Sequence, residues 1–140
     1  MKIAKEFRWE MGHRLPNHDG ACRNVHGHSY RMQVEVEGDV NPETGMVIDF
    51  GDISAKVKPF LAELDHAFLC QESDTEVREL LERMDLKRVM IPVPSTVENI
   101  CMLFIEKLRP AFACEPEVRA FTVRIWETAT SEAEIREVLR

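Results

Sequence analysis

Two histidines, His26 and His28, flank one glycine where a strand-like segment begins, and His13 ends an earlier segment of the same kind. Segments 3–13 and 28–37 alternate apolar and polar residues, which predicts two half-buried strands. All three histidines share the parity of the apolar side. If the strands are antiparallel neighbours, three imidazoles meet at one end of a sheet. Three neutral nitrogen ligands with an open fourth position describe a catalytic zinc site, although other first-row metals also accept imidazole.

Spacing alone leaves a purely structural role open for these histidines, because strand-end histidines are often ordinary hydrogen-bonded rings and H-x-H arises by chance. Cys22 lies four residues before His26 in a turn-like stretch. A nearby dication would lower the pKa of its thiol and make it a proton acceptor or nucleophile. The alternative for Cys22 is an ordinary small buried residue.

Two further places carry acid–base groups. Asp65 directly precedes His66, and a carboxylate beside an imidazole can orient the ring as a proton relay. Adjacent residues need not face each other, so a solvated pair is the alternative.

Glu127 extends the apolar parity of a predicted strand, Val118–Glu127. A carboxylate on that face needs a partner, such as a pair of ligand N–H groups, unless the strand has already ended and Glu127 lies in water.

Helical spacing supplies the remaining elements. It predicts a helix over Asp52–Leu64, a short extra helix over Glu76–Met84, and a third helix that starts at a Ser95–Glu98 capping box. The tail 131–140 fits either a helix or a last strand. This order predicts an α+β domain with helices on one face of an antiparallel sheet.

Composition narrows the class of protein. The 140 residues suffice for one domain, 1–140, and 44% of them are apolar. The net charge of −7 argues against a general nucleic-acid binder, and no apolar run is long enough to predict a membrane span. The N-terminus has no secretory pattern and none of the four cysteines forms a C-x-x-C pair, so we expect reduced thiols in the cytoplasm.

Six segments in this order give the chain a family resemblance: "WEMGHRL", "CRNVHGHSYRMQVEVEG", "GMVIDFGDI", "LDHAFL", "PSTVENI" and "IWETA". Together they resemble the 6-pyruvoyltetrahydropterin synthase / 6-carboxytetrahydropterin synthase family over residues 3 to 130. The resemblance implies a tunnelling fold, with a four-stranded antiparallel sheet and two main helices on one face. Subunits of this family join their sheets into barrels, commonly as a homohexamer of two trimers. The tail would then be the fourth strand, and residues 71–93 an extra helical insertion.

The resemblance also implies roles for individual residues. The metal ligands would be His13, His26 and His28, holding zinc. The catalytic proton acceptor would be Cys22, and Asp65 with His66 would form a relay that reaches a neighbouring subunit's site. The pterin ring of the substrate, 7,8-dihydroneopterin triphosphate, would be anchored by Glu127 and bordered by Ser95 and Thr96.

The spacing of Cys22 and His26 distinguishes branches of the family. Only three residues separate them here, which resembles the bacterial 6-carboxytetrahydropterin synthases of queuosine precursor synthesis rather than the animal pyruvoyl-forming enzymes. The implied reaction releases acetaldehyde and triphosphate. Pyruvoyl formation by triphosphate elimination, or a catalytically silent metal- or pterin-binding module, are the alternatives. Arg14 and Arg23 flank the site residues and are candidates to hold the triphosphate, with solvated surface arginines as the equal alternative.

Overall fold

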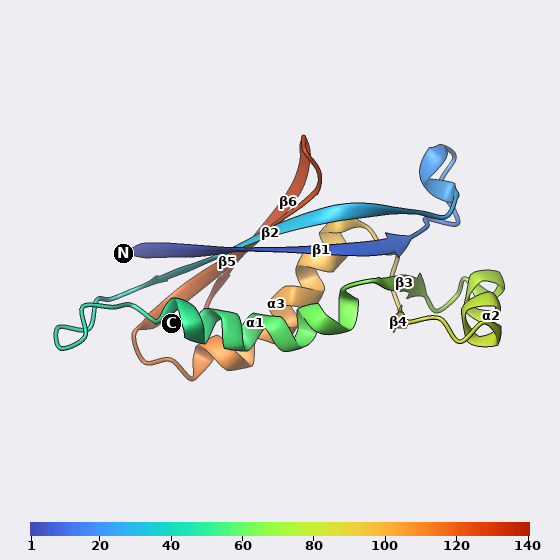
Figure 1. Ribbon diagram of the computed structural model, residues 1–140. Helices are drawn as coiled ribbons and strands as arrows, with labels where there is room; N and C mark the ends of the chain where they lie inside the picture. Colours follow the sequence, from blue (N-terminus) through green and yellow to red (C-terminus); the bar gives the residue numbers. More distant parts are fainter.

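A curved sheet and three helices make up the fold of the computed structural model, which describes all 140 residues. The elements in chain order are β1 (Lys2–His13), the short 3-10 helix η1 (Ala21–Arg23), β2 (His26–Gly38), α1 (Phe50–Leu64), β3 (Ala67–Gln71), α2 (Thr75–Arg83), β4 (Arg88–Ile91), α3 (Val97–Ala113), β5 (Val118–Thr128) and β6 (Ser131–Val138). Helices α1 and α3 lie along the same side of the sheet, and α2 lies at one end with β3 and β4 (Figure 1). The predicted α+β class and the family-type curled sheet are confirmed.

Four long antiparallel strands form the centre of the sheet. β1 pairs with β2, β2 with β5, and β5 with β6, so the alternation in the sequence correctly predicted the first three of these strands. The tail forms β6, and its helical alternative is wrong. Pairing with β5 satisfies the backbone of β6, and Ala133 and Ile135 pack against the core, so tertiary contacts outweigh the local helical pattern.

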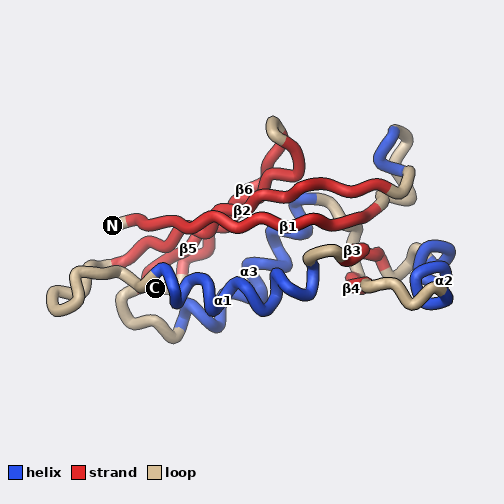
Figure 2. Tube along the Cα trace, viewed as in Figure 1, coloured by secondary structure: helices blue, strands red, loops and turns tan.

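The sheet has six strands, so the predicted number of four is wrong. Its order is β4-β3-β1-β2-β5-β6, and the two additional strands are short and parallel. Both flank α2, and the predicted insertion over residues 71–93 holds α2 and β4 and begins at the last residue of β3. These strands span five and four residues, too few for a clear period of two in the sequence. Figure 2 shows this unit at one end of the molecule and the loop between β2 and α1 at the other.

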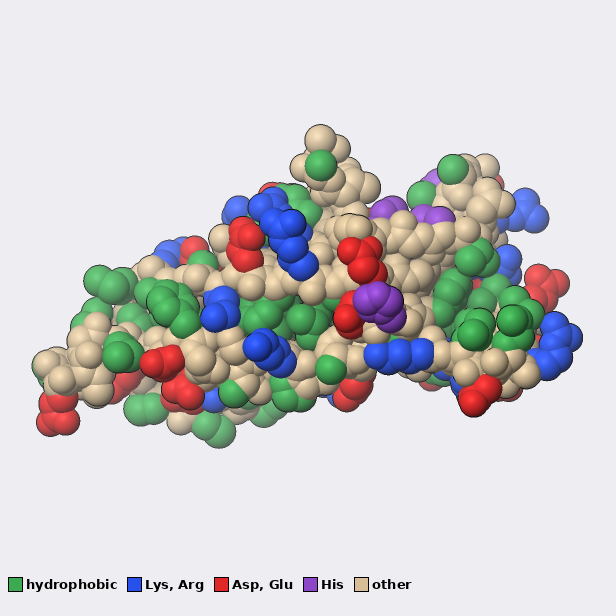
Figure 3. All heavy atoms as spheres, viewed as in Figure 1, with side chains coloured by type: hydrophobic (Ala, Val, Ile, Leu, Met, Phe, Trp, Pro, Cys, Tyr) green, Lys and Arg blue, Asp and Glu red, His purple; other side chains and the backbone are tan.

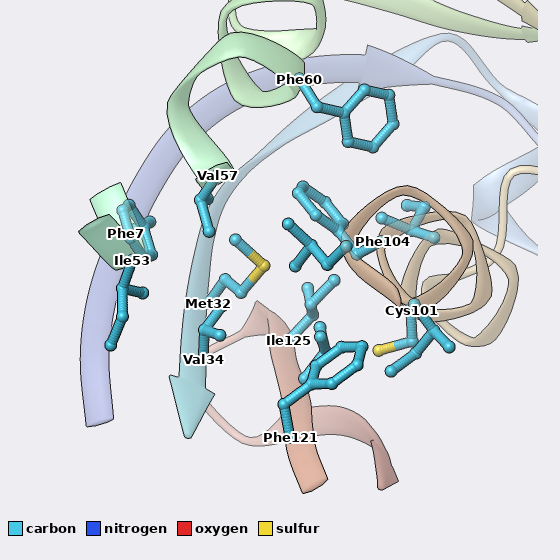
Figure 4. Packing of buried hydrophobic residues seen from close by; sticks show 14 of the residues in the cluster. Phe7, Met32, Val34, Ile53, Val57, Phe60, Cys101, Phe104, Phe121 and Ile125 are labelled. Atoms are coloured by element: carbon cyan, nitrogen blue, oxygen red, sulfur yellow. The ribbon is translucent and has the colours of Figure 1, made fainter. Parts of the chain in front are cut away.

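The core lies between the sheet and the two long helices. It is one cluster of 25 buried residues, in which Met32 and Val34 of β2 face Ile53 and Val57 of α1, as Figure 4 shows. Phe104 of α3 lies at its centre. Burial of each large apolar side chain contributes about 1.5–3 kcal/mol, so this layer holds the ends of β1 and β2 in a fixed position. None of the helices combines the length and apolar character that crossing a membrane requires.

Candidate active site

The three predicted imidazoles converge. His13, the last residue of β1, lies opposite His26, the first residue of β2, and His28 lies opposite Met11 on the same face. The Nε2 atoms of His13 and His26 are 3.1 Å apart. The centre of the His28 ring lies 5.1 Å from that of His13 and 4.9 Å from that of His26. The antiparallel pairing expected from the sequence therefore brings all three rings together.

Glu127 belongs to the same cluster, which sequence reasoning missed. Its Oε1 lies 2.8 Å from Nε2 of His28 and 3.4 Å from Nε2 of His13. One ligand atom from each of these four residues lies within 4.8 Å of the others. The sequence offered only the apolar parity of Glu127 as a signal; that β5 lies next to β2 is known only from the fold. The alternative that Glu127 lies in open water is wrong, because only 19% of its side chain is exposed.

Backbone carbonyls orient two of the rings. Nδ1 of His13 donates to the carbonyl of Ser95 at 2.8 Å, and Nδ1 of His26 donates to the carbonyl of Asn24 at 2.6 Å. A carbonyl oxygen can only accept, so Nδ1 carries the proton in both rings. Each Nε2 therefore presents a lone pair to the cluster, which is the usual arrangement of metal-ligating histidines.

The residues present fit a divalent cation. The Nε2 of His28 is buried and has no hydrogen-bond partner, although Glu127 Oε1 is only 2.8 Å away. The Nε2 lone pairs of His13 and His26 face each other at 3.1 Å, and this contact is repulsive unless a positive charge lies between them. Ligands held about 2.0–2.1 Å from a tetrahedral zinc lie roughly 3.3 Å from one another. The spacing and the orphaned nitrogen both indicate a shared cation.

The local electrostatics favour the protonation states in which these side chains can bind a metal. Burial lowers the pKa of His28, and the neighbouring His13 and His26 lower it further, outweighing the carboxylate of Glu127. The close approach of His13 is the largest influence that lowers the pKa of Glu127, and the proximity of His28 and His26 lowers it further. A neutral imidazole and an ionised carboxylate are the forms that bind a metal.

Cys22 lies in η1, within the loop that joins His13 to His26. Its backbone carbonyl accepts from the N–H of Leu15 at 2.8 Å, which closes the base of this loop. The side chain is half-buried. Its sulfur makes no hydrogen bond and is not among the clustered ligand atoms.

Asp65 and His66 face each other, and both side chains are also exposed to solvent, as the solvated alternative expected. Asp65 Oδ1 lies 3.0 Å from Nδ1 of His66 and accepts from the N–H of Glu10 at 3.0 Å. The backbone of His66 is left-handed, with φ of 59°, and its N–H donates to the Glu10 carbonyl at 2.7 Å. The ring is 76% exposed. His66 and His28 line one open hollow of about 320 Å³ beside the sheet.

Lys87 ties the insertion to this dyad. Its Nζ donates to the carbonyl of Ala62 at 2.8 Å and to that of Asp65 at 2.6 Å, at the C-terminus of α1. A cation there satisfies the last carbonyls of the helix and complements its dipole.

Replacing Lys87 with methionine is expected to lower the free energy of unfolding by about 1 kcal/mol, because two charge-assisted hydrogen bonds are lost at an exposed position. Urea unfolding measures this change. Lys58→Met is the matched control, since Lys58 is an exposed lysine of α1 with no ion pair or side-chain hydrogen bond. Equal stability losses in the two variants would contradict the capping role of Lys87.

A second contact attaches the insertion beside the histidine cluster. Arg14 donates through Nε and Nη2 to the two carboxylate oxygens of Asp74, each at 2.6 Å, and Asp74 is 6% exposed. Ser95 Oγ donates to the carbonyl of Arg14 at 3.3 Å and lies 3.3 Å from Nδ1 of His13. Arg14, which the sequence made a candidate to bind the triphosphate, is therefore already paired with a buried carboxylate.

Asp74→Asn is expected to lower the free energy of unfolding at pH 7 by about 2–3 kcal/mol, because one member of a largely buried ion pair is removed. The hydrogen bond from Arg14 lowers the pKa of Asp74 below its ordinary value of 3.8. Stability from this carboxylate is therefore present above pH 4 and is lost as pH falls through the folded-state pKa. Urea unfolding at pH 7 and at pH 3 should show the difference between wild type and variant shrinking. Asp19→Asn, at an exposed aspartate with no ion pair, is the control; a pH-independent difference would contradict the assignment.

The two residues expected to border the pterin have different surroundings. Ser95 is fully buried against His13 and does not cap α3, so the predicted capping box is wrong. Thr96 is the N-cap, and its Oγ1 accepts from the N–H of Asn99 at 3.4 Å. Thr96 also lines a hollow of about 190 Å³ together with Leu15. Their contact with substrate stays a prediction.

The chain is similar to known proteins over nearly its whole length. The chain matches the family described as 6-pyruvoyl tetrahydropterin synthase over residues 2–138. It is 36% identical to the 6-carboxy-5,6,7,8-tetrahydropterin synthase of Haemophilus influenzae, over 97% of this chain and 99% of that one. It is 30% identical to the enzyme of the same name from Aquifex aeolicus, over 97% and 98% of the two chains.

Solved structures show the same fold. An uncharacterized protein from Wolinella succinogenes superposes with a TM-score of 0.80 at 25% identity, covering 96% of this chain and 97% of that one. The 6-pyruvoyl tetrahydropterin synthase of Plasmodium vivax superposes with a TM-score of 0.79 at 19% identity, covering 99% and 98%.

Proposed function

Because the chain belongs to the 6-pyruvoyl tetrahydropterin synthase family, we propose that it is a zinc-dependent lyase. It converts 7,8-dihydroneopterin triphosphate to 6-carboxy-5,6,7,8-tetrahydropterin, releasing acetaldehyde and triphosphate, as a step toward queuosine. The observation that carries this proposal is the convergence of His13, His26 and His28 with Glu127, around an otherwise unpartnered nitrogen. The names of the relatives from Haemophilus influenzae and Aquifex aeolicus support the carboxy-forming branch.

The three histidines would hold the zinc ion through Nε2. A zinc ion bound there would polarise the hydroxyl groups of the substrate side chain and acidify the adjacent carbon. Ser95 and Asn24 fix two of the rings through their carbonyls. The protein therefore contributes a preorganised ligand set, with its tautomers already chosen.

Two groups would move protons. The Cys22 thiolate accepts a proton from the side chain of the substrate, and His66, oriented by Asp65, exchanges one at the pterin ring. His66 is highly exposed and faces away from its own chain's core, so we propose that the dyad serves the site of a neighbouring subunit.

Glu127 would have two contacts in this scheme. Its Oε1 lies against the imidazoles of His13 and His28, whereas its Oε2 makes no hydrogen bond or ion pair. We propose that Oε2 accepts from the N–H edge of the pterin ring, which fixes the orientation of the substrate beside the metal. Ser95 and Thr96 would border the same ring.

The edges of the sheet support a homo-oligomer with shared sites, and we propose a hexamer of two trimers. Along the side away from β2, β1 pairs with β3 only at Met11 and Gly12, and β6 has no outer neighbour. Unpaired strand edges of this length readily accept another strand. Mass measurement of the intact assembly in solution tests the number of subunits. We also propose a cytoplasmic location, where the four free thiols would stay reduced.

Incubation with 7,8-dihydroneopterin triphosphate, with and without a metal chelator, tests the function. We expect one acetaldehyde per triphosphate released, and loss of both products after metal removal. Triphosphate without acetaldehyde would indicate pyruvoyl formation instead. Absence of any turnover by the zinc-loaded protein would leave a silent metal- or pterin-binding module.

A further inference from the structure

Two arginines face each other on the outward side of the sheet. Arg8 of β1 lies directly opposite Arg31 of β2, and Trp126 of β5 lies opposite Arg31 on its other side. The guanidinium carbon of Arg31 is 3.9 Å from the centre of the Trp126 ring, so the tryptophan supports the arginine by a cation–π contact. A row of two cations and an aromatic ring therefore crosses three strands.

The charges of this row are poorly compensated within the chain. Like charges directly opposite each other on neighbouring strands destabilise a sheet. Arg8 forms no ion pair, and the acidic partner of Arg31, Glu6, is 3.5 Å away with 45% of its side chain exposed. Other arginines at the sheet have close carboxylates: Arg124 donates to Glu134 at 2.6 Å. Arg8 and Arg31 are thus available to an anion.

The arginine pair lies on the outward face of the sheet and the histidine cluster on the core-facing side, and one hollow at the end of the sheet reaches both. Arg8, Arg31 and Trp126 line an open hollow of about 590 Å³ whose walls also include His28 and Glu127. The hollow lies where β5 stops pairing with β2, since their last paired residues are Arg31 and Trp126 and β2 continues further. In Figure 3 basic side chains gather over the strand layer, beside acidic ones. One elongated ligand could therefore contact both the arginines and the cluster.

We propose that Arg8 and Arg31 bind a polyphosphate anion, and that this is the triphosphate arm of the substrate. The assignment rests on the proposed function for the identity of the ligand. A guanidinium offers two parallel donors to phosphate oxygens, and stacking on Trp126 holds the Arg31 fork in one plane. The other two candidate arginines fit this role less well. Arg14 is paired with Asp74, and Arg23, exposed in η1, does not line this hollow.

Calorimetric titration of the zinc-loaded protein with inorganic triphosphate tests the site, with zinc content measured afterwards to show that the anion has not removed the metal. Arg8→Gln and Arg31→Gln are each expected to weaken binding about tenfold or more, because charge-assisted hydrogen bonds are lost. Arg124→Gln is the matched control, since that arginine is committed to Glu134, and it should bind within about twofold of wild type. Wild-type affinity in both arginine variants, or loss of binding in Arg23→Gln alone, would overturn the assignment.

Turnover separates this inference from the function on which it rests. With 7,8-dihydroneopterin triphosphate, the Arg8 and Arg31 variants should raise KM about tenfold and lower kcat/KM by at least that factor, because the arginines bind the triphosphate arm in the ground state and also stabilise the charge that develops on it as it leaves. If wild type turns over and the KM of both variants is unchanged, the anion site is wrong and the function stands. If triphosphate binding depends on the two arginines but wild type makes no product, the anion site stands and the proposed function fails.

Discussion

Replacing His26 with alanine is expected to weaken zinc binding by more than about a hundredfold and to reduce turnover to the uncatalysed background. The Nε2 of His26 is one of the clustered ligand atoms, 3.1 Å from that of His13, so its loss leaves two imidazoles and one carboxylate. His26 is the best position for this test, because its remaining contact is local: Nδ1 donates to the carbonyl of Asn24, two residues away. The fold should therefore persist.

The measurement is a competition titration against a zinc chelator of known affinity, together with urea unfolding to confirm folding. His18→Ala is the matched control: His18 is exposed, and its ring accepts only from the N–H of Gly20. It should keep wild-type affinity. Zinc bound as tightly by His26→Ala as by wild type would contradict the assignment of this ring as a ligand.

Replacing Cys22 with alanine is expected to lower kcat about a hundredfold or more while zinc content stays at one per chain. A positioned acid–base group contributes roughly that factor, and the sulfur is not among the ligand atoms, so metal binding should not depend on it. Single-turnover assays of the zinc-loaded variant measure the chemical step directly. Cys114→Ala, at an exposed cysteine on the far end of α3, should be fully active.

Activity and zinc content, measured together, distinguish an acid–base role of Cys22 from a role as a zinc ligand. A Cys22→Ala protein that retains full activity would show that another group accepts the proton. A variant that loses zinc along with activity would show that the thiol is a ligand instead.

Alternation in the sequence predicted the part of the site that antiparallel pairing controls. Side chains two residues apart share a face, so His26 and His28 had to point the same way, and pairing of β1 with β2 brought His13 opposite His26. The membership of Glu127 depended on a third strand, whose neighbour and register the sequence does not specify. The parity of Glu127 showed only that its side chain faces inward.

Contacts across long stretches of chain were not predictable from local pattern. Arg14 and Asp74 are sixty residues apart, and neither lies in a periodic segment that would have indicated their pairing. The short strands β3 and β4 also escaped prediction, because β3 continues directly from the end of a helical pattern at Leu64. Ser95 was misread as a helix cap, since a buried serine next to His13 and a capping serine have the same local sequence.

The most direct test of the claim that His13, His26 and His28 hold one zinc ion is to identify the ligands of zinc in the loaded protein. X-ray absorption at the zinc edge, or anomalous diffraction from a zinc-loaded crystal, reports the number and type of ligands. We expect one zinc per chain, with three imidazole nitrogens of His13, His26 and His28 at about 2.0–2.1 Å and at least one oxygen. Zinc bound elsewhere in a folded chain, or these rings turned away from one another in the loaded protein, would contradict the account.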